Sequence, residues 1–314
     1  MPRSHKILIG LLSAAIVATL IPLVSQAAGR GGGWDARAEA LKPTIEKLRP
    51  LHKPLAPPQP GDWLAEHKEA GQTFRQYVIQ RPIQPTKERG IIYILPIGVF
   101  TEDQRKVVKL TAEYMAIFFS LPVKMMEPLA SNKIPPGARR AHPVTGEQFL
   151  STYILSQVLK PRLPKDGCVI LGLTATDLWP GRNWNFVFGQ ASIRERVGVW
   201  SIHRKGDPSG SEEEFRQCLL RTIKTAVHET GHMFSIHHCT AYECLMCGSN
   251  SMRESDRRPV VFCPECMAKI CWTTRAEPLA RMKKLAAFCK KHGFESDFQL
   301  YQRQIAVLEG RKPE

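Results

Sequence analysis

The sequence has no long apolar run after residue 24, which argues against a second membrane-spanning helix. Its single long run, residues 7–24, follows Arg3 and Lys6 and leads into small residues around Ala27. A basic start, an apolar middle and a small-residue exit are typical of a secretory signal peptide. We therefore expect residues 1–27 to direct export to the periplasm or the extracellular space, with a retained membrane anchor as the alternative. After cleavage we expect no membrane contact.

The sequence also lacks a long basic block, although its formal charge is +15. Lysine and arginine occur in short pairs, such as Arg139 with Arg140 and Lys283 with Lys284, and aromatic residues are not interleaved with them. Nucleic-acid-binding surfaces usually carry such blocks. We therefore expect a solvated basic surface and no nucleic-acid partner. No internal repeat is visible, and we expect a monomer.

Strand patterns alternate with helical patterns along the middle of the chain. The β-branched run Ile91–Leu95 predicts a strand buried on both faces, as does CVILGLT. Helices are predicted at residues 102–120 and 148–159. Two strands within residues 185–204 have no helix between them, so one of them should be antiparallel and near the sheet edge. This order predicts a three-layer α/β fold with a mixed, mainly parallel sheet.

The strongest motif is HETGHMFSIHHC, residues 228–239, at the end of a predicted helix that starts with a Ser211/Glu214 capping box. On a helix, His228 and His232 lie one turn apart on the same face, so their imidazoles can bind one zinc ion. Glu229 lies beside them, where a general base is needed. The motif therefore predicts a catalytic zinc site.

The third ligand must come from beyond the helix. His238 fits the pattern HExxHxxGxxH, in which a glycine allows the chain to bend back to the metal. Here Ser235 stands at the glycine position. A non-glycine residue at positive φ costs about 1 kcal/mol or more. Either this turn is strained or its geometry differs, and His237 is then the rival ligand.

Five of the nine cysteines fall between Cys239 and Cys266. Cys244, Cys247, Cys263 and Cys266 have the paired CxxC spacing of a tetrahedral structural zinc site, and Cys239 competes as a ligand. The other four are Cys168, Cys218, Cys271 and Cys289. We expect the first two of these to be small buried side chains, whereas an oxidising compartment allows the last two to pair.

The run from His228 to Cys266, with Met246, GSN, DRRP and CPEC in order, resembles the archaemetzincins, a branch of the metzincin peptidases. The segments PGDWLAEHKEAGQTF and GLTATDLWPGRNWNFVFGQAS extend this resemblance over residues 60–270. It implies a metzincin-like zincin fold with an active-site helix and a small C-terminal lobe that carries a zinc site made of four cysteines. The family is mostly intracellular, so the predicted export signal is a departure from it.

The resemblance also implies roles for single residues. His228, His232 and His238 hold a catalytic zinc, Glu229 is the general base, and Met246 forms the Met-turn below the metal. A second, structural zinc is held by Cys239, Cys244, Cys263 and Cys266. Simple spacing would choose Cys247 over Cys239. The family resemblance favours Cys239, because such proteins commonly have Asn at the position of Cys247.

These observations divide the chain into a signal peptide (1–27), a Pro/Gly-rich extension (28–85), a catalytic subdomain ending in the active-site helix (86–236) and a C-terminal subdomain with the structural zinc (237–314). We expect a zinc metallopeptidase that hydrolyses peptide or protein substrates with a zinc-activated water, with aminopeptidase-like action as one form of it. Substrate is expected to add as a strand beside the edge strand within residues 190–203. The alternative is a catalytically silent, zinc-stabilised binding protein.

Overall fold

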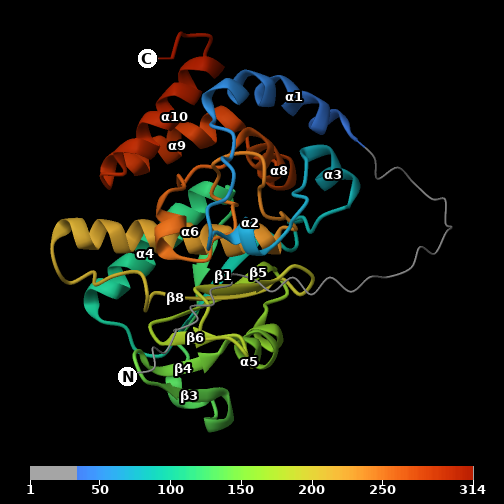
Figure 1. The fold of residues 1–314 in the computed structure, drawn as a ribbon. Helices are drawn as coiled ribbons and strands as arrows, with labels where there is room; N and C mark the ends of the chain where they lie inside the picture. The colour runs from blue at the N-terminus through green and yellow to red at the C-terminus, as the bar shows by residue number, and fades with distance from the viewer. Residues whose placement is uncertain (1–33, 314) are drawn as a thin grey trace.

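The computed structural model describes residues 34–313, and its elements form an α/β fold with helices on both sides of a central sheet (Figure 1). The predicted signal peptide lies outside the described residues. Within residues 34–313, no helix is long and apolar enough to cross a membrane. The predicted three-layer α/β class is confirmed.

The central sheet has five strands in the order β2-β1-β5-β8-β7. All neighbours are parallel except β7 and β8, which are antiparallel, so the sheet is mixed but mainly parallel, as predicted. β7 lies at the edge of the sheet, where one antiparallel strand was expected. The strands are β1 (Ile91–Ile97), β2 (Val123–Met125), β5 (Gly167–Thr174), β7 (Gly189–Ser192) and β8 (Val197–Ser201).

Two apolar cores lie on the two faces of this sheet, because side chains alternate along a strand. In β5, Val169 and Leu171 face the larger core, and Ile170 faces the smaller one. The larger core contains α4 (Glu102–Phe119) and α6 (Glu212–Met233), whose first turns are closed by capping boxes. The smaller core is covered by the helical stretch that starts with α5 (Ser151–Tyr153) and continues as a π-helix (Ile154–Leu159) and a 3-10 turn (Lys160–Arg162), and by a second sheet.

The second sheet was not predicted, and it corrects one expected helix boundary. Its strands are β3 (Arg139–His142), β4 (Gly146–Leu150) and β6 (Asp177–Trp179), in the order β3-β4-β6. The helix expected from residue 148 therefore begins at Ser151. Periodicity alone does not distinguish a helix from a strand in a short apolar run. Here pairing with β3 and β6 makes β4 a strand.

The strand expected at NFVFG also lies slightly later in the chain. Val187 forms only an isolated bridge with Leu178, and the regular strand β7 begins at Gly189. The expectation of a second strand in this region is confirmed, because β8 covers most of RVGVWS.

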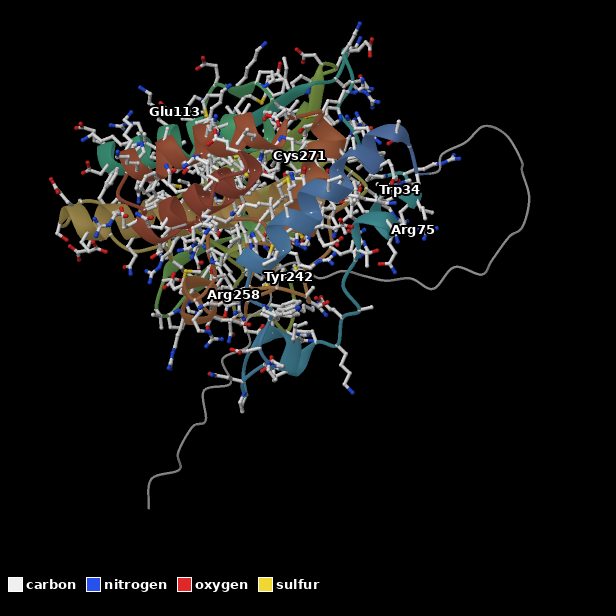
Figure 2. All side chains as sticks on the ribbon, turned by 90° about the horizontal axis from the view of Figure 1, so that it is seen from above. Trp34, Arg75, Glu113, Tyr242, Arg258 and Cys271 are labelled. Carbon is white, nitrogen blue, oxygen red and sulfur yellow. The ribbon has the colours of Figure 1, made fainter. Side chains whose placement is uncertain are left out.

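The segment expected to be an extension before the core packs into it instead. α1 (Ala36–Leu48) buries one face, and this face contacts α8 (Pro264–Thr274). Figure 2 shows α1 lying along the C-terminal helices. The buried side chains of α1 follow helical spacing: Ala38, Leu41, Ile45 and Leu48. Pro and Gly in this region therefore mark connections between short helices, which are a 3-10 turn (Arg49–Leu51), α2 (Trp63–Glu66) and α3 (Phe74–Ile79).

The C-terminal residues form helices, including the two predicted from Pro278. These two, α9 (Pro278–Lys291) and α10 (Glu295–Leu308), pack against each other and against α4 and α1. The short helix α7 (Met252–Asp256) precedes α8. Helices α8 to α10 share the larger core with α4 and α6, so the C-terminal lobe continues the same core. Two 3-10 turns complete the elements, Ser131–Lys133 and Pro136–Ala138.

If α1 is an integral part of the core, Leu48→Ala should lower the free energy of unfolding by about 2–4 kcal/mol, because it deletes a fully buried side chain. Lys47→Ala on the exposed face of the same helix should change it by about 0.5 kcal/mol or less. Guanidinium unfolding of the two variants measures this difference. Equal stabilities would show that α1 is not part of the folded core.

Candidate metal centre and active site

The C-terminal end of α6 brings the first two motif histidines together. His228 and His232 lie one helical turn apart, and their Nε2 atoms are 3.0 Å from each other. The other ring nitrogens are fixed from behind: His228 Nδ1 donates to the carbonyl of Leu245 at 2.9 Å, and His232 Nδ1 donates to that of Ile236 at 2.7 Å. Both Nε2 atoms therefore face the same point, as metal ligation requires.

A sharp reversal after α6 brings His238 to the same point. The helix ends at Met233, and Ser235 takes a left-handed conformation with φ of 66°. Ser235 thus has the backbone that the motif glycine would have. Its hydroxyl accepts a hydrogen bond from the backbone N–H of Ile83 at 3.2 Å, which offsets part of the strain. The chain therefore reverses after α6 through a serine at positive φ, without a glycine.

The ring of His238 lies 5.2 Å from that of His228 and 4.9 Å from that of His232, centroid to centroid. One ring nitrogen from each histidine lies within 4.8 Å of the others. His238 Nε2 is buried and has no hydrogen-bond partner among the described residues, as expected of an atom that binds a metal. His237 is outside this group. The three imidazoles fit a zinc ion with an open fourth position.

Burial also gives the two imidazoles on α6 the charge state that metal binding needs. Desolvation lowers the pKa of His228 to about 3 and that of His232 well below its usual value. The rings are therefore neutral at pH 7, and a neutral imidazole is the form that binds zinc.

Glu229 is buried beside these ligands, and its Oε2 has no hydrogen-bond partner among residues 34–313. Gly189 of β7 packs directly against it: a Cβ at this position would lie 2.9 Å from Glu229 Cγ and Oε1, so the approach requires glycine. Burial raises the pKa of Glu229 to about 8, and the Lys205 ammonium opposes this rise. Lys205 is itself buried and donates to Thr225 at 2.6 Å, and desolvation lowers its pKa to about 7.

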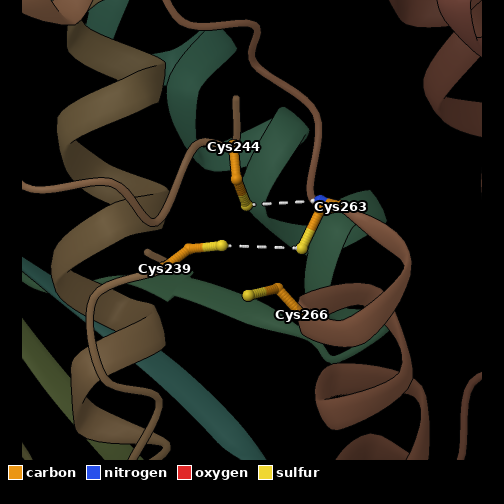
Figure 3. Close-up of side chains that lie close together, drawn as sticks. All are labelled: Cys239, Cys244, Cys263 and Cys266. Carbon is orange, nitrogen blue, oxygen red and sulfur yellow. Dashed lines mark hydrogen bonds between the residues drawn. The ribbon is translucent and has the colours of Figure 1, made fainter. Parts of the chain in front are cut away.

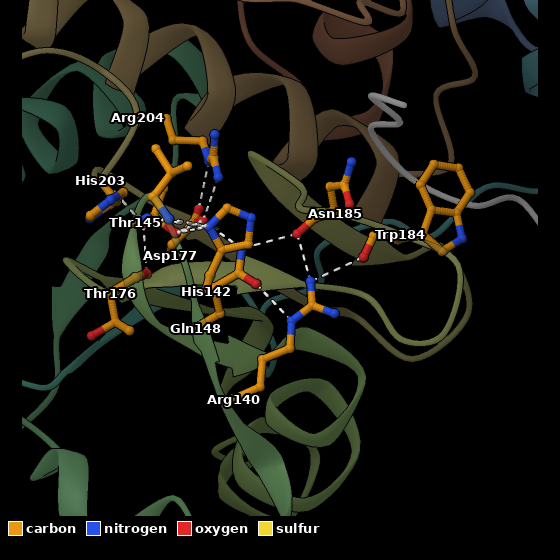
Figure 4. A network of polar contacts seen from close by, with 12 residues as sticks. Arg140, His142, Thr145, Gln148, Thr176, Asp177, Trp184, Asn185, His203 and Arg204 are labelled. Carbon is orange, nitrogen blue, oxygen red and sulfur yellow. Dashed lines mark hydrogen bonds and ion pairs between the residues drawn. The ribbon is translucent and has the colours of Figure 1, made fainter. Parts of the chain in front are cut away.

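A polar network fixes the chain just before β7 (Figure 4). The buried carboxylate of Asp177 accepts hydrogen bonds from Arg204 Nε at 2.8 Å and from Gln148 Nε2 at 2.6 Å. Gln148 Nε2 also donates to the carbonyl of Asn185, as does Arg140 Nη2 at 2.7 Å. The network therefore sets how the edge strand lies over the buried carboxylate of α6.

Met246, which the family resemblance assigns to the Met-turn, packs on α6 at Gly231, next to His232. It is fully buried, and its sulfur packs so closely on Gly231 that a Cβ there would lie 2.7 Å from it. The backbone carbonyl of Met246 accepts a hydrogen bond from Cys239 N at 2.8 Å. Met246 thus links α6 to the first of the clustered cysteines.

Four thiols form a second candidate metal centre, shown in Figure 3. Their sulfur atoms all lie within 4.8 Å of one another, and the four residues are Cys239, Cys244, Cys263 and Cys266. Burial raises the pKa of the Cys244 and Cys263 thiols, whereas hydrogen bonds from neighbouring thiols, that of Cys244 first, lower the pKa of Cys239. A closed set of four buried sulfur donors fits a structural zinc ion.

Cys247 lies outside this set of four. Its thiol donates to the carbonyl of Tyr242 at 3.2 Å, and it lines a cavity of about 40 Å³ beside His228 and Glu229. The structure thus groups the sulfur of Cys239, and not that of Cys247, with the other three. The remaining cysteines are buried free thiols: Cys168, Cys218, Cys271 and Cys289. Cys271 and Cys289, the pair that an oxidising compartment could join, are therefore not bonded to each other in this structure.

The sequence model of Peptidase family M54 matches residues 162–271. Archaemetzincin-2 of Rattus norvegicus is 35% identical over an alignment 253 positions long, which covers 70% of this chain and 70% of that protein. The chain belongs to the archaemetzincin family. The archaemetzincin of Thermococcus kodakarensis is 32% identical over an alignment 188 positions long, which covers 57% of this chain and 95% of that protein. The solved archaemetzincin of Archaeoglobus fulgidus is 32% identical, covers 57% of this chain and 99% of its own, and superposes with a TM-score of 0.46.

As an archaemetzincin, the chain is a zinc metallopeptidase. The structure also shows site residues that sequence reasoning missed. Glu69 accepts from His238 Nδ1, Lys205 faces Glu229, and Trp63 packs on the ring of His238 at 5.1 Å. Glu69 and Trp63 lie in PGDWLAEHKEAGQTF, which resembles the family. The spacing of residues in this segment does not predict a role for either of them. Lys205 carried no signal.

The turn of this archaemetzincin can be tested with two substitutions of Ser235. Ser235→Ala keeps the strained φ and loses the hydrogen bond to Ile83, so it should lower the free energy of unfolding by about 1–2 kcal/mol. Ser235→Gly loses the same bond but relieves the strain, so it should stay within about 1 kcal/mol of wild type. Chemical unfolding of the zinc-loaded proteins provides the comparison. An alanine variant as stable as wild type would contradict this account of the turn.

Proposed function

We propose that this chain hydrolyses peptide bonds with Glu229 as its general base and with a catalytic zinc held by His228, His232 and His238. The observation that carries the proposal is the convergence of three buried imidazoles beside a buried carboxylate that has an unpartnered oxygen. A zinc ion held there would lower the pKa of water, polarise the scissile carbonyl and, by its charge, favour the ionised form of Glu229.

In this mechanism Glu229 moves the proton. Its free Oε2 accepts a proton from the attacking water, holds it in a site from which bulk solvent is largely excluded, and passes it to the leaving amine. Gly189 packs against the carboxylate and confines it, so little reorganisation is needed during the transfer. Lys205 is close enough to oppose the effect of burial on the same carboxylate.

We further propose that the substrate binds extended along β7, as an added strand. Ser201 N donates to Phe188 O, which marks this residue pair as hydrogen-bonded. Because such pairs alternate in an antiparallel ladder, Gly189 and Ala191 direct their N–H and C=O groups away from β8. These groups lie on the outer edge of the sheet, where a peptide backbone can pair with them, and Gly189 itself packs against the base.

The second zinc of the proposal is structural and is held by Cys239, Cys244, Cys263 and Cys266. Cys239 directly follows His238, so a metal held by the four thiols would anchor the chain one residue away from a catalytic ligand. We also propose that residues 1–27 direct export of the protein and that the protein is a monomer.

The competing function is a zinc-stabilised binding protein without turnover. Such a protein has no need of a carboxylate buried beside the metal, where desolvation makes it costly. The presence of Glu229 in that position favours the enzyme.

The first test is Glu229→Gln, with Glu212→Gln on the exposed first turn of α6 as its matched control. We expect Glu229→Gln to lower kcat by about 10²–10⁴-fold, because the base is lost, while the zinc content stays unchanged. A mixed fluorogenic peptide library and elemental analysis measure the two quantities. N-acetylated peptides run in parallel separate aminopeptidase action from internal cleavage. Wild-type protein with bound zinc and no turnover would favour the binding protein.

The second test concerns strand addition. Ala191→Pro removes an N–H that points away from β8, so it should raise KM by about 3–10-fold, the worth of one hydrogen bond, and leave the ladder bonds intact. Ala191→Ser keeps the N–H and serves as the control. An unchanged KM in the proline variant, with normal stability and zinc content, would rule out binding along this edge.

A further inference from the structure

A segment outside the residues matched by the family model contacts the candidate catalytic site. We call residues 62–73 the N-terminal brace; it includes α2 and ends at the capping residue of α3. It contributes none of the three histidines. Its contacts with them and with the turn at Ser235 nevertheless suggest that it belongs to the site.

The first contact is a carboxylate on the third histidine. Glu69 accepts from His238 Nδ1 through both oxygens, at 3.0 and 2.9 Å. The side chain of His238 is 1% exposed and that of Glu69 is 21% exposed, so the pair is largely shielded from water. With Nδ1–H committed to Glu69, the lone pair of His238 lies on Nε2, which faces the other two histidines.

The second contact is aromatic packing between Trp63 and His238. Trp63 packs edge-on against His238, with 5.1 Å between ring centroids and an interplanar angle of 78°. Its ring lies against Gly248, where a Cβ would come within 2.4 Å of it, so glycine is needed there. The backbone N–H of Trp63 donates to the carboxylate of Glu254 at 3.1 Å, which ties the brace to the chain beyond Met246.

The third contact holds the turn itself. The side-chain amide of Gln72 accepts from the backbone N–H of His237 and donates to the carbonyl of Ser235, both at 3.3 Å. The carbonyl of Gln72 in turn accepts from the buried ammonium of Lys269 on α8. The brace therefore bonds to the turn at two points just before the third histidine.

We propose that Glu69 is a positioning residue of the catalytic metal site, and that the N-terminal brace holds His238 in the orientation that the metal requires. This inference rests on the proposed function in one respect, the binding of zinc by the three histidines. Partners of this kind fix the ring and its tautomer, and their loss typically weakens metal binding by about 10–100-fold. The brace is thus a working part of the site although it supplies no ligand.

The test measures zinc affinity in the full chain by competition with a chelator, with Glu69→Ala, Glu69→Gln and Glu66→Gln compared with wild type. We expect Glu69→Ala to weaken zinc binding at the histidine site by about 10–100-fold. Glu69→Gln should restore most of this affinity, because an amide oxygen can still accept from His238 Nδ1. Glu66→Gln is the matched control, since Glu66 lies in the same segment and contacts Asn250.

The four-thiol site serves as an internal reference for metal loss at the histidine site. The two sites are told apart by replacing zinc with cobalt, because cobalt bound to thiolates and cobalt bound to imidazoles absorb light differently. Loss at the histidine site alone in Glu69→Ala, with rescue in Glu69→Gln, would establish the proposal. Unchanged affinity in Glu69→Ala, or equal loss at both sites, would overturn it. If wild-type protein binds no zinc at the histidines, the proposed function itself fails, and that result is visible before any variant is compared.

Discussion

The reversal of the chain after α6 is the constraint on which the site depends. A helix can present two histidines one turn apart, but a third can reach the same point only if the chain turns back within a few residues. Here that turn passes through a serine in the left-handed region, and the cost is offset by bonds from outside the motif. Residues before β1 supply these bonds, so the site is completed by chain far from the motif.

The two candidate metal centres are joined by the shortest link a chain can make. His238 and Cys239 are consecutive, and the backbone of Cys239 is bonded to Met246, which packs on α6 at Gly231. The two centres therefore share one stretch of backbone. A separate contact links the edge strand to the base. Gly189 of β7 packs against Glu229, and the Lys205 ammonium opposes the effect of burial on the pKa of Glu229.

Sequence reasoning succeeded where the chemistry is local. The capping box at Ser211 and the spacing of His228 and His232 are readable over a few residues, and the structure shows the cap and brings those histidines together. Cysteine spacing alone favoured Cys247, whereas the family resemblance favoured Cys239, which the structure groups with the other three sulfur atoms. It failed where distant pairing decides the outcome. β4 became a strand because β3 and β6 lie beside it, and Glu69 acquired a partner 169 residues away. No periodicity encodes such contacts.

The packing of α1 on α8 affects the order in which parts of the molecule fold. These helices come from opposite ends of the chain, and contacts of such large sequence separation form slowly, because loop closure precedes any gain from the contact. During synthesis the buried face of α1 lacks its main partner until α8 has emerged. Until then the left-handed turn and its bonds to the N-terminal segment lack their final support. Competence to bind metal at the histidines should therefore arise late, as one of the last events of folding.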